Sequence, residues 1–500
     1  MKKFLAILLA AMMLLAMTAA FAESAATFSI TVPASTTGVS HTYEVYQIFT
    51  GTLSDDGTIL SEVTWGANGT GTTGEAVADD VLTELTGTNG TDKEKLAVIS
   101  TYVDLTSDPF TTVADGAAVT VPAGYYLIKD TDKSLDEAHD AYTTYIVYVC
   151  NNVTVAPKSV YPTVDKQVQD EVGDAETGST DGWGESADHA INETFAFRLI
   201  ATLPASEKYA DYTTYTVTFN DTMSDGITFE EIVSVTVDGQ TVTDYACSAT
   251  AGQAGGSWTL TIADLKTIAN VNLIDGADVV VVYNAHLNED AQVDTESVTS
   301  TDNENSVYLT YSNNPNVAGE GKTPTDYVWV FTYTVENTKY ANTAAEGHEL
   351  AGAGFTLYSG DVAIKLIDNG DGTYTVAAQD ATDGVVTEMM TKEDGLFNII
   401  GLDAGSYTLK ETTVPDGYNK CEDKTIIITA SHMENEAEND AEMTLNTAST
   451  MANDIVNKSG ATLPETGGIG TTLFYLLGGL MTAGSALILV VRRRADAEEE

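Results

Sequence analysis

Apolar and polar residues alternate with a period of two along much of the middle of this chain. The segment 212–219 (YTTYTVTF) alternates threonine with aromatic residues or valine, and related β-type runs lie at 142–149, 279–283 and 425–429. Asp-Gly and Asn-Gly pairs, which favour tight hairpin turns, punctuate these runs at 225–226, 238–239, 275–276, 369–370 and 371–372. The predicted fold class is therefore all-β, with immunoglobulin-like β-sandwich domains in tandem.

Helical patterning is sparse, and its best candidates are 75–85 and 94–105 in the first third of the chain. Proline and polar residues cluster at 156–162 and at 313–324, which indicates two domain boundaries. We therefore predict three β domains, 23–158, 159–325 and 326–458, of about 135 to 170 residues each, which is a normal domain size.

The N-terminus has the three parts of a secretory signal peptide. Lys2 and Lys3 precede an apolar run that extends from Phe4 to Met17, and the small residues Ala20 and Ala22 follow. A charged start, an apolar centre and a small-x-small cleavage site predict that residues 1–22 direct secretion and are removed.

The C-terminal segment 459–500 carries three signals in order. The first is the pentapeptide Leu463-Pro464-Glu465-Thr466-Gly467. A mostly apolar stretch at 469–491 follows, long enough to span a bilayer as a transmembrane helix, and then the basic residues 492–494. The pentapeptide resembles the LPXTG sorting signal of sortase substrates on Gram-positive cell walls. That resemblance implies cleavage between Thr466 and Gly467, with Thr466 held as a thioester until an amine attacks it.

The charge balance is strongly acidic, with a formal net charge of -52 at pH 7. Such a chain is unsuited to binding nucleic acid or an anionic membrane surface. The three cysteines, Cys150, Cys247 and Cys421, are too few and too widely spread for a disulfide framework, and we expect each to be a small buried apolar group. The six histidines have no metal-site spacing, so neither a metal nor a cofactor is predicted.

The third domain contains two motifs, 350–358 (LAGAGFTLY) and 407–418 (YTLKETTVPDGY). Together they resemble the collagen-adhesin B-type domain over about 330–458. The resemblance implies an intramolecular isopeptide bond between Lys339 and Asn457, promoted by the acid Glu411.

The second domain opens with 162–168 (PTVDKQV) and continues with 215–229 (YTVTFNDTMSDGITF) and 305–315 (NSVYLTYSNNP). These segments resemble the isopeptide-forming domain of Gram-positive fimbrial subunits. The resemblance implies Lys166 as the amine and Asp221 as the acid. Asn305 is the expected asparagine, with Asn288 and Asn313 as rivals that spacing does not exclude. In the first domain, 121–128 (VPAGYYLI) resembles the N-terminal pilin domain.

The chemistry of such a bond depends on burial. A lysine amine with its usual pKa of about 10.4 is protonated and not nucleophilic. Burial in an apolar core favours the neutral amine and also a protonated carboxylic acid. The acid then polarises the asparagine carbonyl, the amine attacks, and ammonia leaves. Because each domain reacts once with itself, the protein is its own substrate and not an enzyme.

A further lysine lies at the first boundary, in 153–158 (VTVAPK). This segment resembles the pilin motif, with Ala156 at the position of the usual tyrosine. The resemblance implies that Lys158 attacks Thr466 of another copy, which gives a head-to-tail covalent pilus. Expected partners are sortase, other copies of the chain, minor pilins, peptidoglycan and a host surface ligand. The alternative function is that of a monomeric wall-anchored adhesin or an accessory pilin that binds a host surface.

Overall fold

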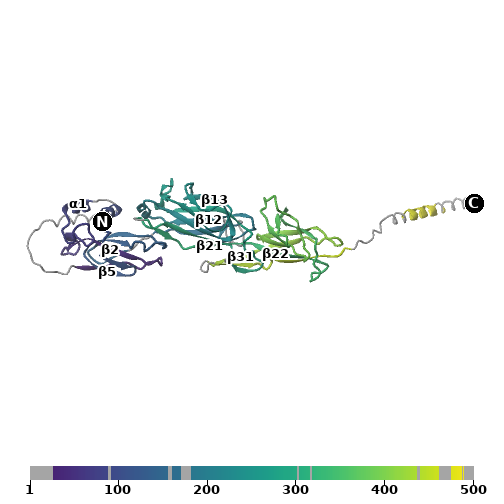
Figure 1. The fold of residues 1–500 in the computed structure, drawn as a ribbon, viewed down its shortest axis with the longest axis horizontal. Coiled ribbons are helices and arrows are strands. Elements are labelled where there is room, and N and C mark those ends of the chain that lie inside the picture. The colour runs from purple at the N-terminus through teal and green to yellow at the C-terminus, as the bar shows by residue number, and fades with distance from the viewer. Residues whose placement is uncertain are drawn as a thin grey trace, which may run out of the picture.

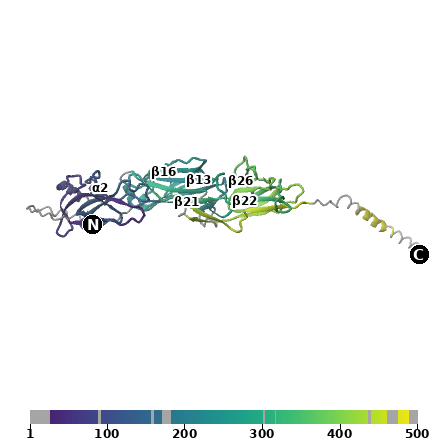
Figure 2. The ribbon, with the colours of Figure 1, turned by 60° about the horizontal axis from the view of Figure 1, so that its bottom comes forward.

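The computed structural model describes residues 26–87, 92–155, 160–170, 182–300, 303–315, 318–435, 440–460, 475–486 and 488. Three β units follow one another along the long axis of the molecule (Figures 1 and 2). The predicted signal peptide, Lys158 and the pentapeptide Leu463–Gly467 lie outside the described residues. Among the described residues, no helix has the length and apolar character needed to cross a membrane. The all-β prediction is confirmed.

The first unit combines two sheets with two short helices. One sheet has the order β3-β2-β6-β7 with β4 on β2, and the other has the order β5-β1-β8. The elements are β1 (Thr27–Thr31), β2 (Thr42–Leu53), β3 (Leu60–Trp65), α1 (Asp79–Gly87), α2 (Asp92–Ser100), β4 (Thr111–Ala114), β5 (Ala118–Pro122), β6 (Gly124–Asp130), β7 (Thr144–Val149) and β8 (Val153–Thr154).

The two helices exist, but their predicted bounds were wrong. The backbone of residues 75–77 is paired with β3, as in the hydrogen bond from Val77 N to Val63 O of 2.9 Å, so α1 begins only at Asp79. After Ser100 the chain returns to the β2–β3 region, where Val103 forms a bridge with Gly69. In both places β pairing takes the backbone groups that a longer helix would have used.

The second unit is a two-layer sandwich. Strands β9, β12, β17 and the second half of β13 form one layer, and β16, the first half of β13, β19 and β21 form the other. The strands are β9 (Thr163–Gln169), β10 (Trp183–Gly184), β11 (Ser186–Asp188), β12 (Thr194–Leu203), β13 (Val217–Val237), β14 (Gln240–Thr241), β15 (Ala246–Cys247), β16 (Gln253–Ile262), β17 (Ala277–Leu287), β18 (Val298–Ser300), β19 (Glu304–Ser312), β20 (Glu320–Lys322) and β21 (Asp326–Phe331).

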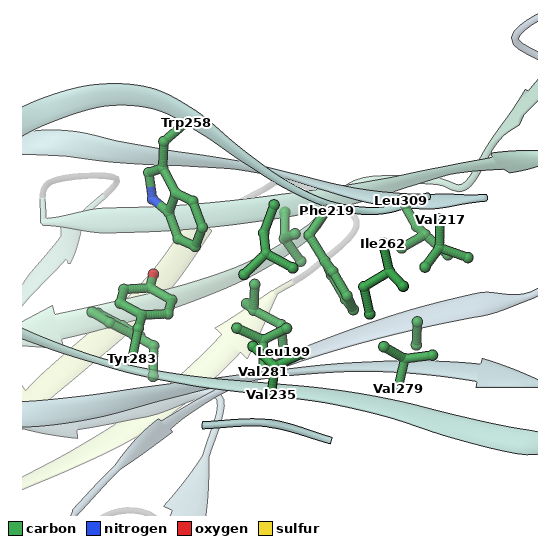
Figure 3. Close-up of a cluster of buried hydrophobic side chains, with 14 of the residues drawn as sticks. Leu199, Val217, Phe219, Val235, Trp258, Ile262, Val279, Val281, Tyr283 and Leu309 are labelled. Carbon is green, nitrogen blue, oxygen red and sulfur yellow. The ribbon is translucent and has the colours of Figure 1, made fainter. Parts of the chain in front are cut away.

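Apolar side chains from both layers fill the space between them. In Figure 3, Phe219, Trp258 and Leu309 project from one layer toward Leu199, Val281 and Tyr283 of the other. All six are at most 1% exposed. Three short 3-10 helices, Glu207–Asp211, Leu265–Thr267 and Leu273–Asp275, lie in the connections.

The 21-residue strand β13 belongs to both layers. It pairs with β16 and β19 up to Met223, and from Ile227 it pairs with β17, while two further pairs with β16 lie at Thr228 and Phe229. The predicted hairpin turn at Asp225-Gly226 was therefore wrong, because this pair lies where the strand changes layers. At Asp238-Gly239 the prediction was correct: these residues join β13 to β14 with φ of 50° and 76°.

Residues 212–216 were predicted as part of a strand, and this was also wrong. The strand β13 starts at Val217. The preceding N–H groups instead donate to side chains, as in the hydrogen bond of 3.0 Å from Tyr215 N to Asp264 Oδ1. The rings of Tyr209 and Tyr212 each pack edge-on against Tyr215, with centroids 5.0 Å apart.

The third unit is also a two-sheet sandwich, smaller than that of the second unit. Its sheets have the orders β25-β26-β28-β22-β33 and β24-β23-β29-β30, with β27 on β23. The strands are β22 (Tyr333–Ala341), β23 (Gly354–Ser359), β24 (Val362–Ala363), β25 (Leu366–Asp368), β26 (Thr373–Val376), β27 (Met389–Met390), β28 (Asn398–Leu402), β29 (Gly405–Thr413), β30 (Lys424–Ile428), β31 (Ala430–Asn435), β32 (Asp440–Leu445) and β33 (Ala452–Asn457).

The second and third units share structural elements. Along β21, Val328 and Val330 belong to the core of the second unit, while Trp329 and Phe331 belong to the core of the third. The β31–β32 hairpin of the third unit pairs with β18 of the second, and Figure 1 shows β31 beside β21. The two sandwiches are therefore joined by packing as well as by the chain.

The first and second units meet through the 131–143 segment. Tyr142 N donates to Asn313 O at 2.8 Å, and Lys322 N donates to Ala138 O at 3.0 Å. These backbone hydrogen bonds join the end of β19 and the strand β20 to the first unit.

Candidate functional site

The second unit buries a lysine, an acid and an asparagine between its two layers. Lys166 lies on β9, Asp221 on the first half of β13, and Asn305 on β19. Each is 0% exposed. Because β13 and β19 are hydrogen-bonded neighbours, with Met223 opposite Asn305, the acid and the asparagine approach the lysine from the same layer.

The hydroxyl group of Tyr283, on β17, connects these three side chains. Lys166 Nζ donates hydrogen bonds to Asp221 Oδ2 and, at 3.2 Å, to Tyr283 Oη. The Tyr283 hydroxyl donates to Asp221 Oδ2 at 3.1 Å and accepts from Asn305 Nδ2 at 2.6 Å. The rival asparagines are engaged elsewhere: Asn288 Nδ2 donates to Asp225 O and Asn313 Nδ2 to Leu135 O.

Burial dominates the protonation of this cluster. It lowers the pKa of Lys166, although the charge of Asp221 acts in the opposite direction. It raises the pKa of Asp221, against the effect of Lys166. The Phe197 ring, whose centroid is 5.3 Å from Lys166 Nζ, is part of the apolar surroundings. Both shifts favour the neutral amine and the neutral acid.

The third unit also buries a lysine, an acid and an asparagine together. Lys339 lies on β22 and Asn457 on β33, which are parallel neighbours, and Glu411 lies on β29 of the opposite sheet. Lys339 Nζ is 2.6 Å from Asn457 Oδ1 and 3.4 Å from Glu411 Oε1. Asn457 Nδ2 donates to Glu411 Oε1 at 2.6 Å. The three residues are at most 2% exposed.

The surroundings of this second cluster also favour the reactive form of the amine. Burial lowers the pKa of Lys339, against the nearby charges of Cys421 and Glu411. The Phe355 ring centroid lies 5.1 Å from Nζ. The second carboxylate oxygen of Glu411 accepts a hydrogen bond of 2.8 Å from the backbone N–H of Cys421. Every polar atom of the acid is thus held in place by a named partner.

In the first unit, the described residues contain no fully buried lysine. Instead, the core of this unit buries a histidine between two aspartates. His41 Nδ1 lies 2.8 Å from Asp130 Oδ1, and Nε2 lies 3.0 Å from Asp140 Oδ2. Burial by itself would lower the pKa of His41, but the hydrogen bonds to the two carboxylates raise it to about 10.

Two of the side chains around these clusters were not singled out by sequence reasoning. Tyr283 was read as part of an apolar strand, and His41 was not considered. Neither has a sequence signal of its own, because each acts through strands that are distant in the chain. The three cysteines are free, as predicted, but they are only partly buried, so the expectation that each is a buried apolar group was wrong in degree. No group of metal-binding side chains occurs in the described ranges.

Three family models match the chain. They are a Gram-positive pilin backbone subunit 2, Cna-B-like domain at 191–315, a prealbumin-like fold domain at 333–444, and the LPXTG cell wall anchor motif at 455–498. A search of curated proteins found no match.

Solved structures with a similar arrangement include three pilins. The full-length major pilin SpaD from Corynebacterium diphtheriae is 16% identical over 88% of this chain and 98% of its own, with a TM-score of 0.47. The T6 backbone pilin of serotype M6 Streptococcus pyogenes is 16% identical over 87% and 98%, with a TM-score of 0.48. The major pilin subunit BcpA of Bacillus cereus is 16% identical over 87% and 99%, with a TM-score of 0.41.

Tandem β-sandwiches that precede an LPXTG anchor motif define a surface protein attached to the cell wall. The pilin backbone domain identifies the kind of surface protein more closely. The chain is a structural pilus subunit that carries a Gram-positive pilin backbone domain and an LPXTG cell wall anchor motif.

Proposed function

We propose that the subunits are joined head to tail by an isopeptide bond from Lys158 of one copy to Thr466 of the next. Sortase would cleave after Thr466 and hold it as a thioester, and the Lys158 amine would displace the enzyme's thiol. The linkage joins two different sites of the chain head to tail, so it is open and generates a filament. The pilin backbone domain at 191–315, which follows Lys158 in the chain, and the anchor motif at 455–498, which contains Thr466, support this arrangement.

We further propose that the second and third units are each cross-linked internally, from Lys166 to Asn305 and from Lys339 to Asn457. The observation that carries this proposal is the burial of two complete lysine–acid–asparagine clusters in separate cores. Lysine and acidic side chains are almost never fully buried unless they are paired, because their removal from water is costly. Two such clusters of equal composition in one chain favour a shared chemical role.

The third-unit geometry supports a direct reaction. The neutral amine of Lys339 attacks the Asn457 side-chain carbonyl, whose oxygen is 2.6 Å from Nζ. A carbon–nitrogen bond forms and the amide C–Nδ2 bond breaks. Glu411, 2.6 Å from Nδ2, transfers the proton that lets ammonia leave and recovers one from the attacking amine. Asp221 is the corresponding acid in the second unit, where it is hydrogen-bonded to the attacking amine of Lys166.

Gel electrophoresis of cell-wall extracts tests the intermolecular linkage. We expect a high-mass ladder from the wild type and its collapse in a Lys158→Ala strain. Lys133→Ala is the matched control, because Lys133 is exposed in the same unit, and its ladder should persist. A single band in all three strains would contradict polymerisation and favour a monomeric adhesin.

Intact-mass measurement tests the internal bonds. The chain from Ala26 to Gly460 should lack two molecules of ammonia relative to its sequence. Lys166→Ala and Lys339→Ala should each restore one of them. An unmodified wild-type mass would rule out self-crosslinking and leave the pilus linkage untouched.

A further inference from the structure

The Tyr283 hydroxyl occupies the centre of the second-unit cluster. It lies 3.2 Å from Lys166 Nζ, 3.1 Å from Asp221 Oδ2 and 2.6 Å from Asn305 Nδ2. The last atom is the nitrogen that must depart as ammonia in the proposed cross-link. The carbonyl oxygen of Asn305 makes no hydrogen bond to any described residue. The amide therefore contacts the cluster through its leaving group.

The third unit has a different arrangement, and the difference has a simple steric origin. There the acid is Glu411, which reaches the leaving nitrogen of Asn457 directly at 2.6 Å. Asp221 is one methylene shorter. Within the described residues, no hydrogen bond joins Asp221 to Asn305, and the Tyr283 hydroxyl lies between them. A shorter acid and a bridging phenol thus replace one longer acid.

We infer that Tyr283 is a catalytic residue that relays a proton from Asp221 to the leaving nitrogen of Asn305. The inference rests on the proposed cross-link in this unit. As Lys166 Nζ bonds to the Asn305 side-chain carbon, it gives up one proton to Asp221. Nδ2, no longer conjugated with the carbonyl, then has a lone pair that can accept a hydrogen bond from Tyr283 Oη. Asp221 donates a proton to Tyr283 Oη as Tyr283 passes its own proton to Nδ2, which reverses the direction of both resting hydrogen bonds. The C–Nδ2 bond breaks, ammonia leaves, and both Asp221 and Tyr283 end as they began.

The environment of the ring suits this role. Trp258 packs edge-on against Tyr283 with centroids 5.0 Å apart, and Phe197 and Phe229 lie at 5.2 and 5.6 Å. Figure 3 shows the hydroxyl pointing across the core toward the opposite layer. Burial raises the pKa of Tyr283 well above its ordinary value. The phenol therefore stays protonated between transfers and both donates and accepts a hydrogen bond.

The test compares how fast the second-unit bond forms in three full-length chains. All carry Lys339→Met, so that only the second unit can lose ammonia. The parent, a Tyr283→Phe chain and a Tyr215→Phe chain are made by cell-free translation without sortase. Samples are denatured at intervals and their intact masses measured. Tyr215 is the matched control, because it is a fully buried tyrosine of the same core that packs against Tyr209 and Tyr212.

We expect Tyr283→Phe to slow ammonia loss by about 100-fold or more, the usual contribution of a positioned proton-transfer group. Tyr215→Phe should react at the parental rate. Adding Asp221→Glu to the Tyr283→Phe chain should restore part of the rate, because the longer acid can reach the amide nitrogen as Glu411 does. A simple packing role for the ring predicts no such rescue.

Two results would overturn the inference, and they are distinguishable. A parent that never loses ammonia refutes the proposed cross-link, and the relay with it. A parent and a Tyr283→Phe chain that lose ammonia equally fast refute only the relay. If circular dichroism shows that Tyr283→Phe does not fold, 3-fluorotyrosine at position 283 replaces it. This residue keeps the ring and hydroxyl but is more acidic, so a relay predicts a changed rate and packing alone predicts an unchanged one.

Discussion

Replacing Lys339 with methionine should lower the stability of the third unit by an amount that its topology sets. The change removes the nucleophile, keeps a side chain of similar length, and leaves the hydrogen bond between Asn457 and Glu411 in place. What is lost is the proposed covalent closure between two residues 118 positions apart. If a covalent cross-link restricts the unfolded chain as a disulfide does, a loop of this length is worth about 5 kcal/mol.

For a domain of this size, that loss corresponds to a fall in melting temperature of roughly 15–25 °C. Differential scanning calorimetry of the chain without its termini measures it. The unfolding transition of the third unit is recognised as the one whose midpoint temperature changes in Lys339→Met and stays the same in Lys166→Met. Lys424→Met is the matched control, because Lys424 is exposed on β30 of the same unit.

A clear result would refute this reasoning. If the wild-type mass shows the bond, and Lys339→Met nevertheless melts at the wild-type temperature, then closure of the long loop contributes little. The stabilisation would in that case have to come from the packing of the buried side chains alone.

Three further predictions concern other parts of the molecule. Because the pKa of His41 is raised to about 10, the stability that its charge contributes is complete below pH 6.5 and is lost as the pH rises through about 10. The first unit should therefore unfold more easily as the pH rises across that range. In His41→Gln, the stability of this unit should depend less on pH. Gly226→Ala should destabilise the second unit by about 1–3 kcal/mol in urea unfolding, because the added Cβ would lie 2.6 Å from a backbone atom of a neighbouring segment. Gly87→Ala should be tolerated, because a Cβ at position 87 has no atom within 4 Å. Asn305→Ala should abolish ammonia loss from the second unit while Asn288→Ala retains it, as intact masses will show; the opposite pattern would reassign the partner of Lys166.

Local sequence patterns predicted the β class but not the places where strands change partners. The Asp-Gly pairs at 225–226 and 238–239 have the same local signal. Only the second is a hairpin, because at the first pair the chain continues into the other layer of the sandwich. That outcome depends on pairing with β16 and β17, which are formed by later residues. A dipeptide pattern contains no information about such distant partners.

In the candidate site, too, some residues could be predicted from local sequence patterns and others could not. Lysines are scarce in this acidic chain, so Lys166 and Lys339 at the starts of two domains were conspicuous, and the motif of 407–418 contained Glu411. Tyr283 was not conspicuous, because it follows four valines in a strand-like run. Its hydroxyl meets Asn305 only when β17 and β19 face each other across the core. The chemistry of a residue in such a run depends on the fold and not on its neighbours in sequence.

The positions of the two clusters decide which parts of a stretched filament carry tension. In the proposed polymer, a pulling force enters each subunit at Lys158 and leaves at Thr466. With both internal bonds formed, it passes from Lys166 to Asn305, follows the chain to Lys339, and crosses to Asn457. Segments 167–304 and 340–456 are then mechanically bypassed and cannot be drawn out. The first unit precedes Lys158 and lies outside the load path altogether, so it has no mechanical need for a covalent bond.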